Sequence, residues 1–199
     1  NLIKAQGKTT TDHISPAGPW LKLRGHLDKF SDNLLSGGTN AFTDEPGTAI
    51  NVLGNKGTDT VANVARIYKA AGRKWVIVGD ANYGEGSSRE HAALSPRLLG
   101  GVAVIAKSFA RIHEANLKKQ GLLALTFQNP DAYDSLGAED RLNLTGLDDL
   151  APGKPVTCTV RRADGSTDTL RLNHTFSESQ LGWFRSGSAV NLFNQSQAA

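Results

Sequence analysis

Residues 74–106 read KWVIVGDANYGEGSSREHAALSPRLLGGVAVIA, and this stretch decides the fold. It begins with an apolar, β-branched run at 74–78 and ends with a second such run at 102–106, each of the length of a buried strand. Between them, a glycine-rich loop at 79–86 leads into a helical pattern at 88–99, which we expect to bend at its internal proline. The order strand, loop, helix, strand predicts a parallel α/β unit.

The same alternation continues on both sides of this unit. Residues 60–71 predict a helix that begins at a Thr60 cap. Residues 110–120 predict another helix, and residues 122–127 predict a third buried strand. We therefore expect an α/β core over residues 59–140, with a parallel or mixed central sheet and flanking helices.

From residue 141 onward the pattern changes to the strict alternation that is typical of antiparallel strands. Asp164-Gly165 forms a strong hairpin turn signal between two of these strands. An amphipathic helix over 177–194 and a frayed tail from Gln195 should close the chain. Residues 141–199 thus predict a small antiparallel lobe and a terminal helix. The expected strands lie at 142–144, 156–161 and 167–172. The apolar positions of the helix are Leu181, Phe184, Val190 and Phe193.

Residues 1–58 are rich in glycine, threonine, asparagine and proline, and they predict irregular structure. Within them, residues 36–57 form a loop that is long enough to be a lid, a binding loop or an interdomain contact. The chain begins at Asn1 with sequence that already reads as structured. We therefore expect a processed end or a piece of a longer protein.

The composition bounds the class of protein. The 199 residues are 39% apolar and 21% charged, which is typical of a soluble globular protein. The 22 basic and 19 acidic residues are well mixed and give a net charge of +3, so we expect no nucleic-acid partner. We interpret the short basic clusters Lys118-Lys119 and Arg161-Arg162 as solvated faces. No apolar run approaches the ~20 residues of a membrane helix, so no membrane partner is expected.

The single cysteine, Cys158, lies in an alternating run and predicts a buried structural thiol. One cysteine cannot by itself bind a structural zinc ion or an iron–sulfur cluster. We therefore assign no metal ligand to this chain.

The loop after the first buried strand carries the features of an anion site. In α/β sheets, ligands bind beyond the carboxyl ends of the strands, and the glycines at 84 and 86 permit close backbone approach there. A helix that starts at the serines offers unpaired N–H groups to a carboxylate. Arg89 adds a planar fork of donors. The residues alone leave Ser87 open between this role and a capping box with Glu90.

Other motifs are absent or ambiguous. The nucleophile pattern G-x-S-x-G, the Walker A pattern and the dinucleotide fingerprint do not occur around Ser87. Upstream, residues 9–16 gather hydroxyls, Asp12 and His13. Taken singly, Asp12 reads as a turn or cap residue and His13 reads as a structural histidine.

Several runs of residues, spread over nearly the whole chain, resemble one known protein family. These runs are 12–15, 18–22, 24–27, 79–80, 82–94, 107–114, 116–123, 173–176 and 183–189. These runs resemble the C-terminal domain of aconitases, closest to the mitochondrial type. The resemblance implies a swivelling β/β/α domain of an aconitate hydratase of the tricarboxylic acid cycle, and hence the mitochondrial matrix. It also implies a [4Fe–4S] cluster that other domains of the same enzyme bind, with a tricarboxylate as substrate.

The resemblance assigns roles residue by residue. Ser87 matches the serine that acts as the catalytic base, deprotonated as an alkoxide. Ser88 and Arg89 match substrate-binding residues, and Arg24 matches an arginine that binds a substrate carboxylate. Asp12 and His13 match positions near the site. The isolated chain is then expected to hold no cluster and to catalyse nothing.

Three alternatives stay open. A homoaconitase would differ in its substrate. The small subunit of an isopropylmalate isomerase typically carries a cysteine within its glycine–serine loop, where Glu85 stands here. The third alternative is a non-enzymatic aconitase-like interaction module.

Overall fold

The fold is that of a computed structural model, which describes residues 1–54 and 57–197. The strands are β1 (Ile3–Lys4), β2 (Thr48–Ile50), β3 (Thr58–Thr60), β4 (Trp75–Gly79), β5 (Gly101–Ala106), β6 (Leu123–Phe127), β7 (Arg141–Thr145), β8 (Val156–Arg161) and β9 (Thr167–Asn173). The α-helices are α1 (Thr11–Ile14), α2 (Leu27–Phe30), α3 (Val61–Ala70), α4 (His91–Leu98), α5 (Arg111–Lys119), α6 (Glu178–Arg185) and α7 (Ala189–Gln197). The 3₁₀ helices are η1 (Gly18–Leu23), η2 (Ser31–Asn33) and η3 (Pro130–Tyr133).

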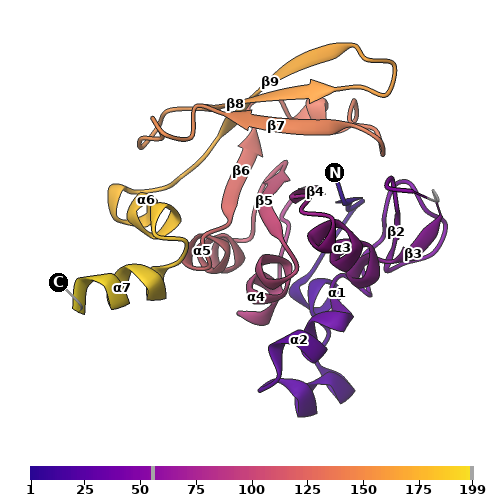
Figure 1. The fold of residues 1–199 in the computed structure, drawn as a ribbon, viewed down its shortest axis with the longest axis horizontal. Coiled ribbons are helices and arrows are strands. Elements are labelled where there is room, and N and C mark those ends of the chain that lie inside the picture. The colour runs from indigo at the N-terminus through magenta and orange to yellow at the C-terminus, as the bar shows by residue number, and fades with distance from the viewer. Residues whose placement is uncertain (55–56, 198–199) are drawn as a thin grey trace.

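A mixed seven-stranded sheet forms the centre, in the order β1-β4-β5-β6-β9-β8-β7 (Figure 1). The first four strands in this order are parallel, and the last three are antiparallel. The predicted α/β class with a mixed sheet and flanking helices is confirmed. The predicted antiparallel strands form as well, and they extend the central sheet because β9 pairs with β6 at Thr126↔Asn173 and Phe127↔Leu172. A separate two-stranded sheet, β2 with β3, was not predicted.

The strand β4 explains why the sheet lies between two cores. Trp75 and Ile77 enter one cluster, in which helices α3, α4 and α5 also bury their apolar residues. Val76 and Val78 point to the opposite face and enter a second cluster with β8 and β9. Because successive side chains of a strand alternate between faces, one continuous apolar run can supply both cores. The result is a layer of helices, the parallel strands, and a curved antiparallel layer above them (Figure 1).

The segment 1–58, which we expected to be irregular, contains short regular elements. Ile3 and Lys4 pair in parallel with Ile77 and Val78, so the start of the chain forms the edge of the central sheet. Two residues are too few to show periodicity in the sequence. The strand that they pair with also lies far away in the chain, so the local sequence does not reveal the pairing. The expected loop 36–57 contains β2, and its residues 55–56 lie outside the described part.

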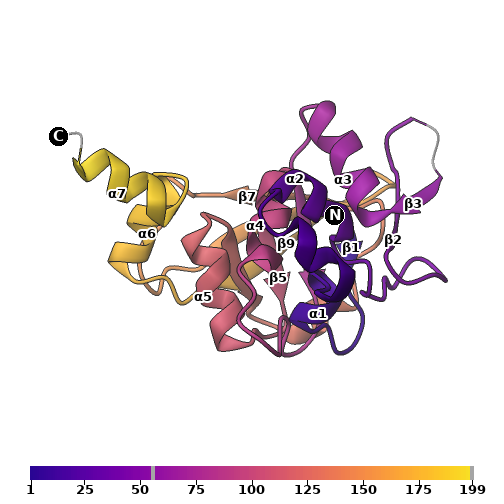
Figure 2. The same cartoon turned by 90° about the horizontal axis from the view of Figure 1, so that it is seen from below.

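The terminal helix over 177–194 was wrong as a single element. Two helices form, α6 and α7, and Gly187 lies between them with φ of 88°. Val190 and Phe193 were expected on a buried face, but they are 65% and 62% exposed. α7 extends away from the body (Figure 2), and it continues to Gln197, beyond Gln195, where we expected the chain to fray. Amphipathic spacing marks a face that can be buried, and it does not provide the surface that buries it.

Lys118 also departs from its expected solvated position. Its side chain is buried, and its ammonium pairs with Glu114 at 2.9 Å and lies 5.0 Å from the centre of the Phe176 ring. It therefore ties α5 to the segment after β9. None of the described helices is long and apolar enough to span a membrane.

Candidate functional site

The loop between β4 and α4 is held by backbone hydrogen bonds on both of its sides. On one side, Gly84 N donates to Thr9 O at 2.8 Å, and Thr11 N donates to Glu85 O at 2.8 Å. On the other side, Tyr83 N donates to Ser108 O at 2.9 Å. The N-terminal segment, the serine loop and the turn after β5 therefore form one connected structure at the carboxyl end of the parallel strands, which is where ligands bind in open α/β sheets.

Ser87 does not cap helix α4, so one of the two roles that the residues alone left open is excluded. Helix α4 begins at His91, so the N-cap position is Glu90, and its side chain makes no capping hydrogen bond. Ser87 therefore lies three residues before the cap. The backbone around it has non-helical geometry, with φ of 114° at Gly86, and Arg89 N donates to Ser87 O at 2.8 Å. The hydroxyls of Ser87 and Ser88 lie on exposed residues, so capping does not occupy them.

Arg89 is oriented by the segment upstream of it in the chain. Its Nη1 donates to the carboxylate of Asp12 and, at 2.9 Å, to the carbonyl oxygen of Ser15. The hydrogen bond from Arg89 holds the pKa of the Asp12 carboxyl below its usual value. Because the Asp12 side chain is 66% exposed, water screens this pair and its contribution to stability is small. The pair fixes the direction of the guanidinium.

Arg24 reaches the same region from the loop after η1. His91 Nε2 lies 3.0 Å from the carbonyl oxygen of Arg24, directly after the serine loop. The ring of His91 packs on Phe30 of α2 with the ring centroids 4.4 Å apart, which fixes the position of that loop. The side chain of Arg24 is exposed. Arg24 and Arg89 thus come from distant parts of the chain, and the backbone of Arg24 contacts the first residue of the helix that follows the serine loop.

His13 has a local structural role. Its Nδ1 accepts a hydrogen bond from Thr10 N at 3.2 Å, and its own backbone N donates to Thr10 Oγ1 at 3.2 Å. This reciprocal pair caps α1, the helix that carries Asp12. The structure therefore joins Arg89 of the serine loop to Asp12, and it places the backbone of Arg24 against His91, directly after that loop. His13 supports the helix that carries Asp12.

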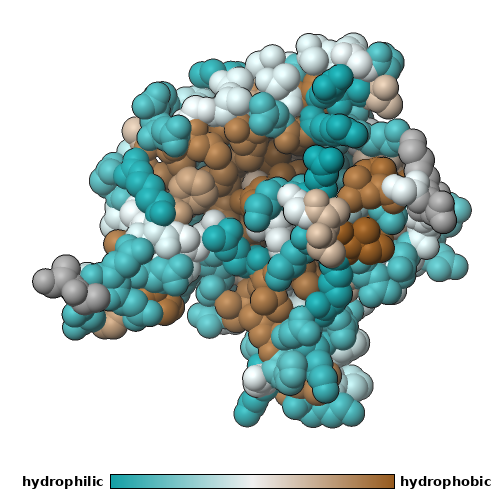
Figure 3. All heavy atoms as spheres, in the orientation of Figure 1, coloured by the Kyte–Doolittle hydropathy of each residue, from teal (hydrophilic) through white to brown (hydrophobic). Residues whose placement is uncertain are grey.

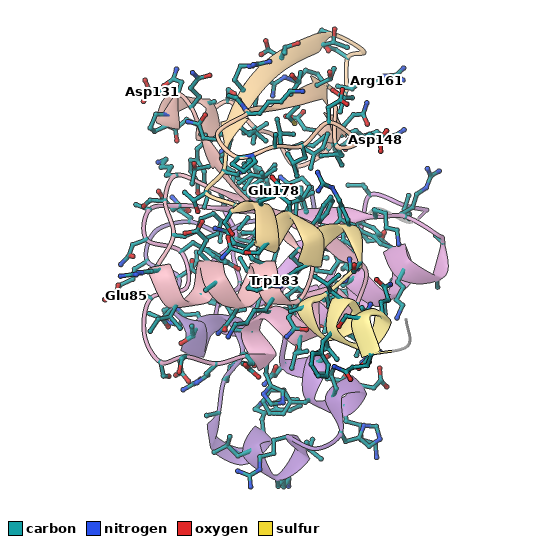
Figure 4. The ribbon with its side chains drawn as sticks, turned by 90° about the vertical axis from the view of Figure 1, so that its left-hand side faces the viewer. Glu85, Asp131, Asp148, Arg161, Glu178 and Trp183 are labelled. Atoms are coloured by element: carbon teal, nitrogen blue, oxygen red, sulfur yellow. The ribbon has the colours of Figure 1, made fainter. Side chains whose placement is uncertain are left out.

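Glu85 lies at the outer edge of the molecule, far from Asp148 and Arg161 on the antiparallel side (Figure 4). It forms an exposed ion pair with Lys8 at 3.2 Å. On the serine loop itself, Ser87 and Ser88 are exposed, whereas the Arg89 side chain is only 25% exposed. Nothing on this side of the described chain covers the serines.

The sequence interpretation did not identify His113 as part of this region. Sequence alone suggested an ordinary structural histidine on a helix. In the structure its ring packs beneath Gly84, where a β-carbon would lie 2.2 Å from His113 Cδ2. A glycine at 84 and a histidine at 113 give no spacing signal, because only the fold brings them together.

A metal centre is not assembled by residues 1–54 and 57–197, since no group of three His, Cys, Asp or Glu side chains gathers there. Cys158 is buried in β8, and burial raises the pKa of its thiol to about 11. Such a thiol stays protonated, whereas cluster iron binds thiolates. The described side chains therefore do not fit the ligand set of an iron–sulfur cluster.

An apolar hollow of about 480 Å³ lies elsewhere, beneath β7 and beside α3, and its lining includes Leu142, Leu144 and Tyr68. Figure 3 shows it as a brown depression below the antiparallel strands. None of the expected site residues lines it. The hollow and the serine loop are therefore separate parts of the described structure.

Comparison with solved structures first defines the class of fold. A 3-isopropylmalate dehydratase from Methanocaldococcus jannaschii matches with a TM-score of 0.60 and 20% identity, over 99% of this chain and 94% of that one. At this identity the match shows the fold alone. The family itself follows from sequence: residues 1–130 match the aconitase C-terminal domain, and the chain belongs to this family.

Curated relatives agree with this assignment. The mitochondrial aconitate hydratase of Gracilaria gracilis is 62% identical over 96% of this chain and 24% of that protein. The mitochondrial aconitate hydratase of Saccharomyces cerevisiae is 56% identical, again over 96% of this chain and 24% of that protein. The chain thus spans about a quarter of the length of these relatives.

Proposed function

We propose that this chain is the C-terminal domain of an aconitate hydratase and supplies the base and the substrate-binding arginines of its active site. The observation that carries the proposal is the arrangement of Arg89. Asp12 and Ser15 hold its guanidinium in place, and the exposed Ser87 and Ser88 directly precede Arg89 in the chain. The aconitate hydratases of Gracilaria gracilis and yeast support the choice of reaction.

The substrate of such an enzyme is a tricarboxylate, and the charges at the site suit it. Arg89 and Arg24 each offer a planar fork that can bind a carboxylate through two hydrogen bonds. The carboxylate of Asp12 already satisfies part of Arg89, which leaves its remaining N–H groups for substrate. Two cations beside two hydroxyls favour a substrate with several negative charges over a neutral one.

Ser87 acts as the base in this proposal. Dehydration of citrate to cis-aconitate transfers a proton from carbon to Ser87 Oγ, and the electron pair of the broken C–H bond forms the double bond as hydroxide leaves the neighbouring carbon. The Lewis acid that accepts this hydroxide would be the cluster of the other domains. A serine hydroxyl is a poor base in water, so its alkoxide needs positive charge nearby. Arg89, two residues away in the chain, supplies part of that charge. Ser88 lies next to Ser87 and donates a hydrogen bond to the substrate.

The described residues contain no ligand set for an iron–sulfur cluster, so we propose that other domains of the longer enzyme bind the [4Fe–4S] cluster and close over the exposed face of this loop. Those domains are then the partners of this chain. The relatives are named as mitochondrial enzymes, and we propose the mitochondrial matrix as the location of this protein too.

The test compares citrate turnover by the whole enzyme carrying Arg89→Gln with turnover by the enzyme carrying Arg185→Gln. Arg185 lies on α6 and bonds to Glu178 and to the carbonyl oxygen of Leu150, away from the serine loop. We expect Arg89→Gln to lower kcat/KM by about 10²-fold or more, because a misplaced carboxylate loses its reactive geometry. Arg185→Gln should leave it nearly unchanged. Equal effects of the two substitutions would refute a substrate-binding role for Arg89.

The isolated 199-residue chain provides a second test. It should show no turnover of citrate or cis-aconitate, because the cluster-binding domains are missing. Measurable turnover by the chain alone would contradict the proposal. A native gene product no longer than this chain would instead favour a separate subunit or an interaction module.

A further inference from the structure

His113 is a fully enclosed histidine with no visible hydrogen-bonding role. It is 2% exposed, and neither ring nitrogen finds a partner within the described part of the chain. Burying a polar group without a partner costs roughly 1–3 kcal/mol. An apolar side chain would avoid this cost, so the ring must be retained at this position for another reason.

The ring is in close contact with the backbone of the serine loop. A β-carbon built on Gly84 would lie 2.2, 2.3 and 2.5 Å from three carbon atoms of His113. The ring therefore occupies the space in which any other residue at 84 would carry its side chain. Gly84 has φ of 83°, so the loop turns sharply at the point of contact.

A second contact joins the same ring to the residue before the glycine. The rings of Tyr83 and His113 lie 5.5 Å apart at their centroids. Ala110 N, at the start of α5, donates to Tyr83 O at 3.0 Å. Helix α5 thus contacts both Tyr83 and Gly84, and a shift of the ring would be transmitted to the residues that follow.

We propose that His113 is a positioning residue that sets the place of Ser87 by supporting Gly84 with its ring. The inference rests on the proposed role of Ser87 as base. A planar ring lets the loop approach α5 closely, whereas a branched side chain of similar volume is thicker and would push Gly84 outward. Close packing transmits such a displacement along a short loop.

This support should affect the reaction step more than substrate binding. Arg89 is held independently by Asp12 and Ser15. The loop can therefore shift at Ser87 while the guanidinium keeps its direction. A positioning role then appears as a fall in kcat with little change in KM.

The experiment measures citrate turnover by the whole enzyme with His113→Leu and with His113→Phe. We expect the leucine variant to lose about 100-fold in kcat, the order expected for a misplacement near 1 Å, with KM within threefold of wild type. The phenylalanine variant keeps a flat ring and should stay within about threefold in kcat. Equal losses in the two variants, or a loss confined to KM, would overturn the proposal. If the leucine variant does not fold, His113→Ala replaces it with the same expected loss.

Two further comparisons separate positioning from general damage. Asn116 lies one turn further along α5 and is also buried, 5% exposed, with its Nδ2 unpartnered among the described residues. Asn116→Leu should keep kcat near wild type, and an equal fall would overturn the proposal. In an enzyme that already carries Ser87→Ala, His113→Leu should cause no further loss, whereas an additive loss would mean that His113 acts elsewhere. Wild-type turnover by Ser87→Ala alone would instead refute the proposed function.

Discussion

The contact between Gly84 and His113 predicts a large, specific loss of stability on Gly84→Ala. The φ of 83° at Gly84 costs an alanine about 1–2 kcal/mol. The added β-carbon would also overlap the enclosed His113 ring at 2.2 Å, and overpacking of this kind costs about 1–3 kcal/mol. The expected total loss in the free energy of unfolding is about 2–5 kcal/mol.

Gly72→Ala is the matched control. Gly72 has φ of 67° and nothing within 4 Å of its added β-carbon, so its alanine variant has the backbone strain without the overlap. In thermal unfolding of the 199-residue chain, 1 kcal/mol corresponds to about 2–4 °C in Tm. Gly84→Ala should therefore lower Tm by roughly 4–20 °C, and Gly72→Ala by roughly 2–8 °C.

A double-mutant cycle identifies the overlapping side chain. His113→Ala removes the ring, so Gly84→Ala should destabilise that variant less than it destabilises the wild type, by about 0.5–3 kcal/mol. Equal shifts for Gly84→Ala and Gly72→Ala, or a cycle with no coupling energy, would refute the reasoning.

Three other predictions test separate parts of the structure. The pKa of the Asp12 carboxyl, measured by NMR titration, should lie below 3.8, because the hydrogen bond from Arg89 lowers it. Arg89→Gln should return this pKa to about 3.8. An unchanged Asp12 pKa in that variant would contradict the pairing of Arg89 with Asp12. Burial lowers the pKa of His113 from 6.5 to about 4, so the unfolded chain binds a proton first, and stability should fall by about 3 kcal/mol as the pH drops from 6.5 to 4. Free energies of unfolding from urea titrations should lack this pH-dependent loss in His113→Phe. The same pH dependence in the wild type and in His113→Phe would contradict the prediction. Gly121→Ala would place a β-carbon 2.0 Å from Gly187 O. The Tm of this variant should fall by at least as much as that of Gly72→Ala, in which nothing lies within 4 Å of the added β-carbon. A smaller fall would mean that the connection between α6 and α7 moves without cost.

The sequence predicted the parallel part of the fold well because its signals are local. The run around Val76 is apolar and β-branched, and Thr60 caps α3 through its side chain as expected. The hairpin at Gly165 also forms, with φ of 86°. The errors arise where distant contacts decide the structure. Val190 has helical spacing but stays exposed, because no described element covers it.

The site shows the same division. An anion-binding loop was predicted from its glycines, serines and arginine, and it stays a prediction. The residues left a capping role for Ser87 open, and the structure excludes it because α4 starts at His91; helix starts are the least reliable feature of a local pattern. The orientation of Arg89 by Asp12 joins residues that are 77 positions apart, so only the fold could provide it.

The central claim is that this chain supplies the base of an aconitate hydratase. The most direct test is the steady-state turnover of citrate by the whole enzyme with Ser87→Ala, compared with wild type under identical cluster loading. Removal of a positioned base should lower kcat by about 10²–10⁴-fold, with a much smaller change in KM because Arg24 and Arg89 remain. A wild-type kcat in the Ser87→Ala enzyme would contradict the claim.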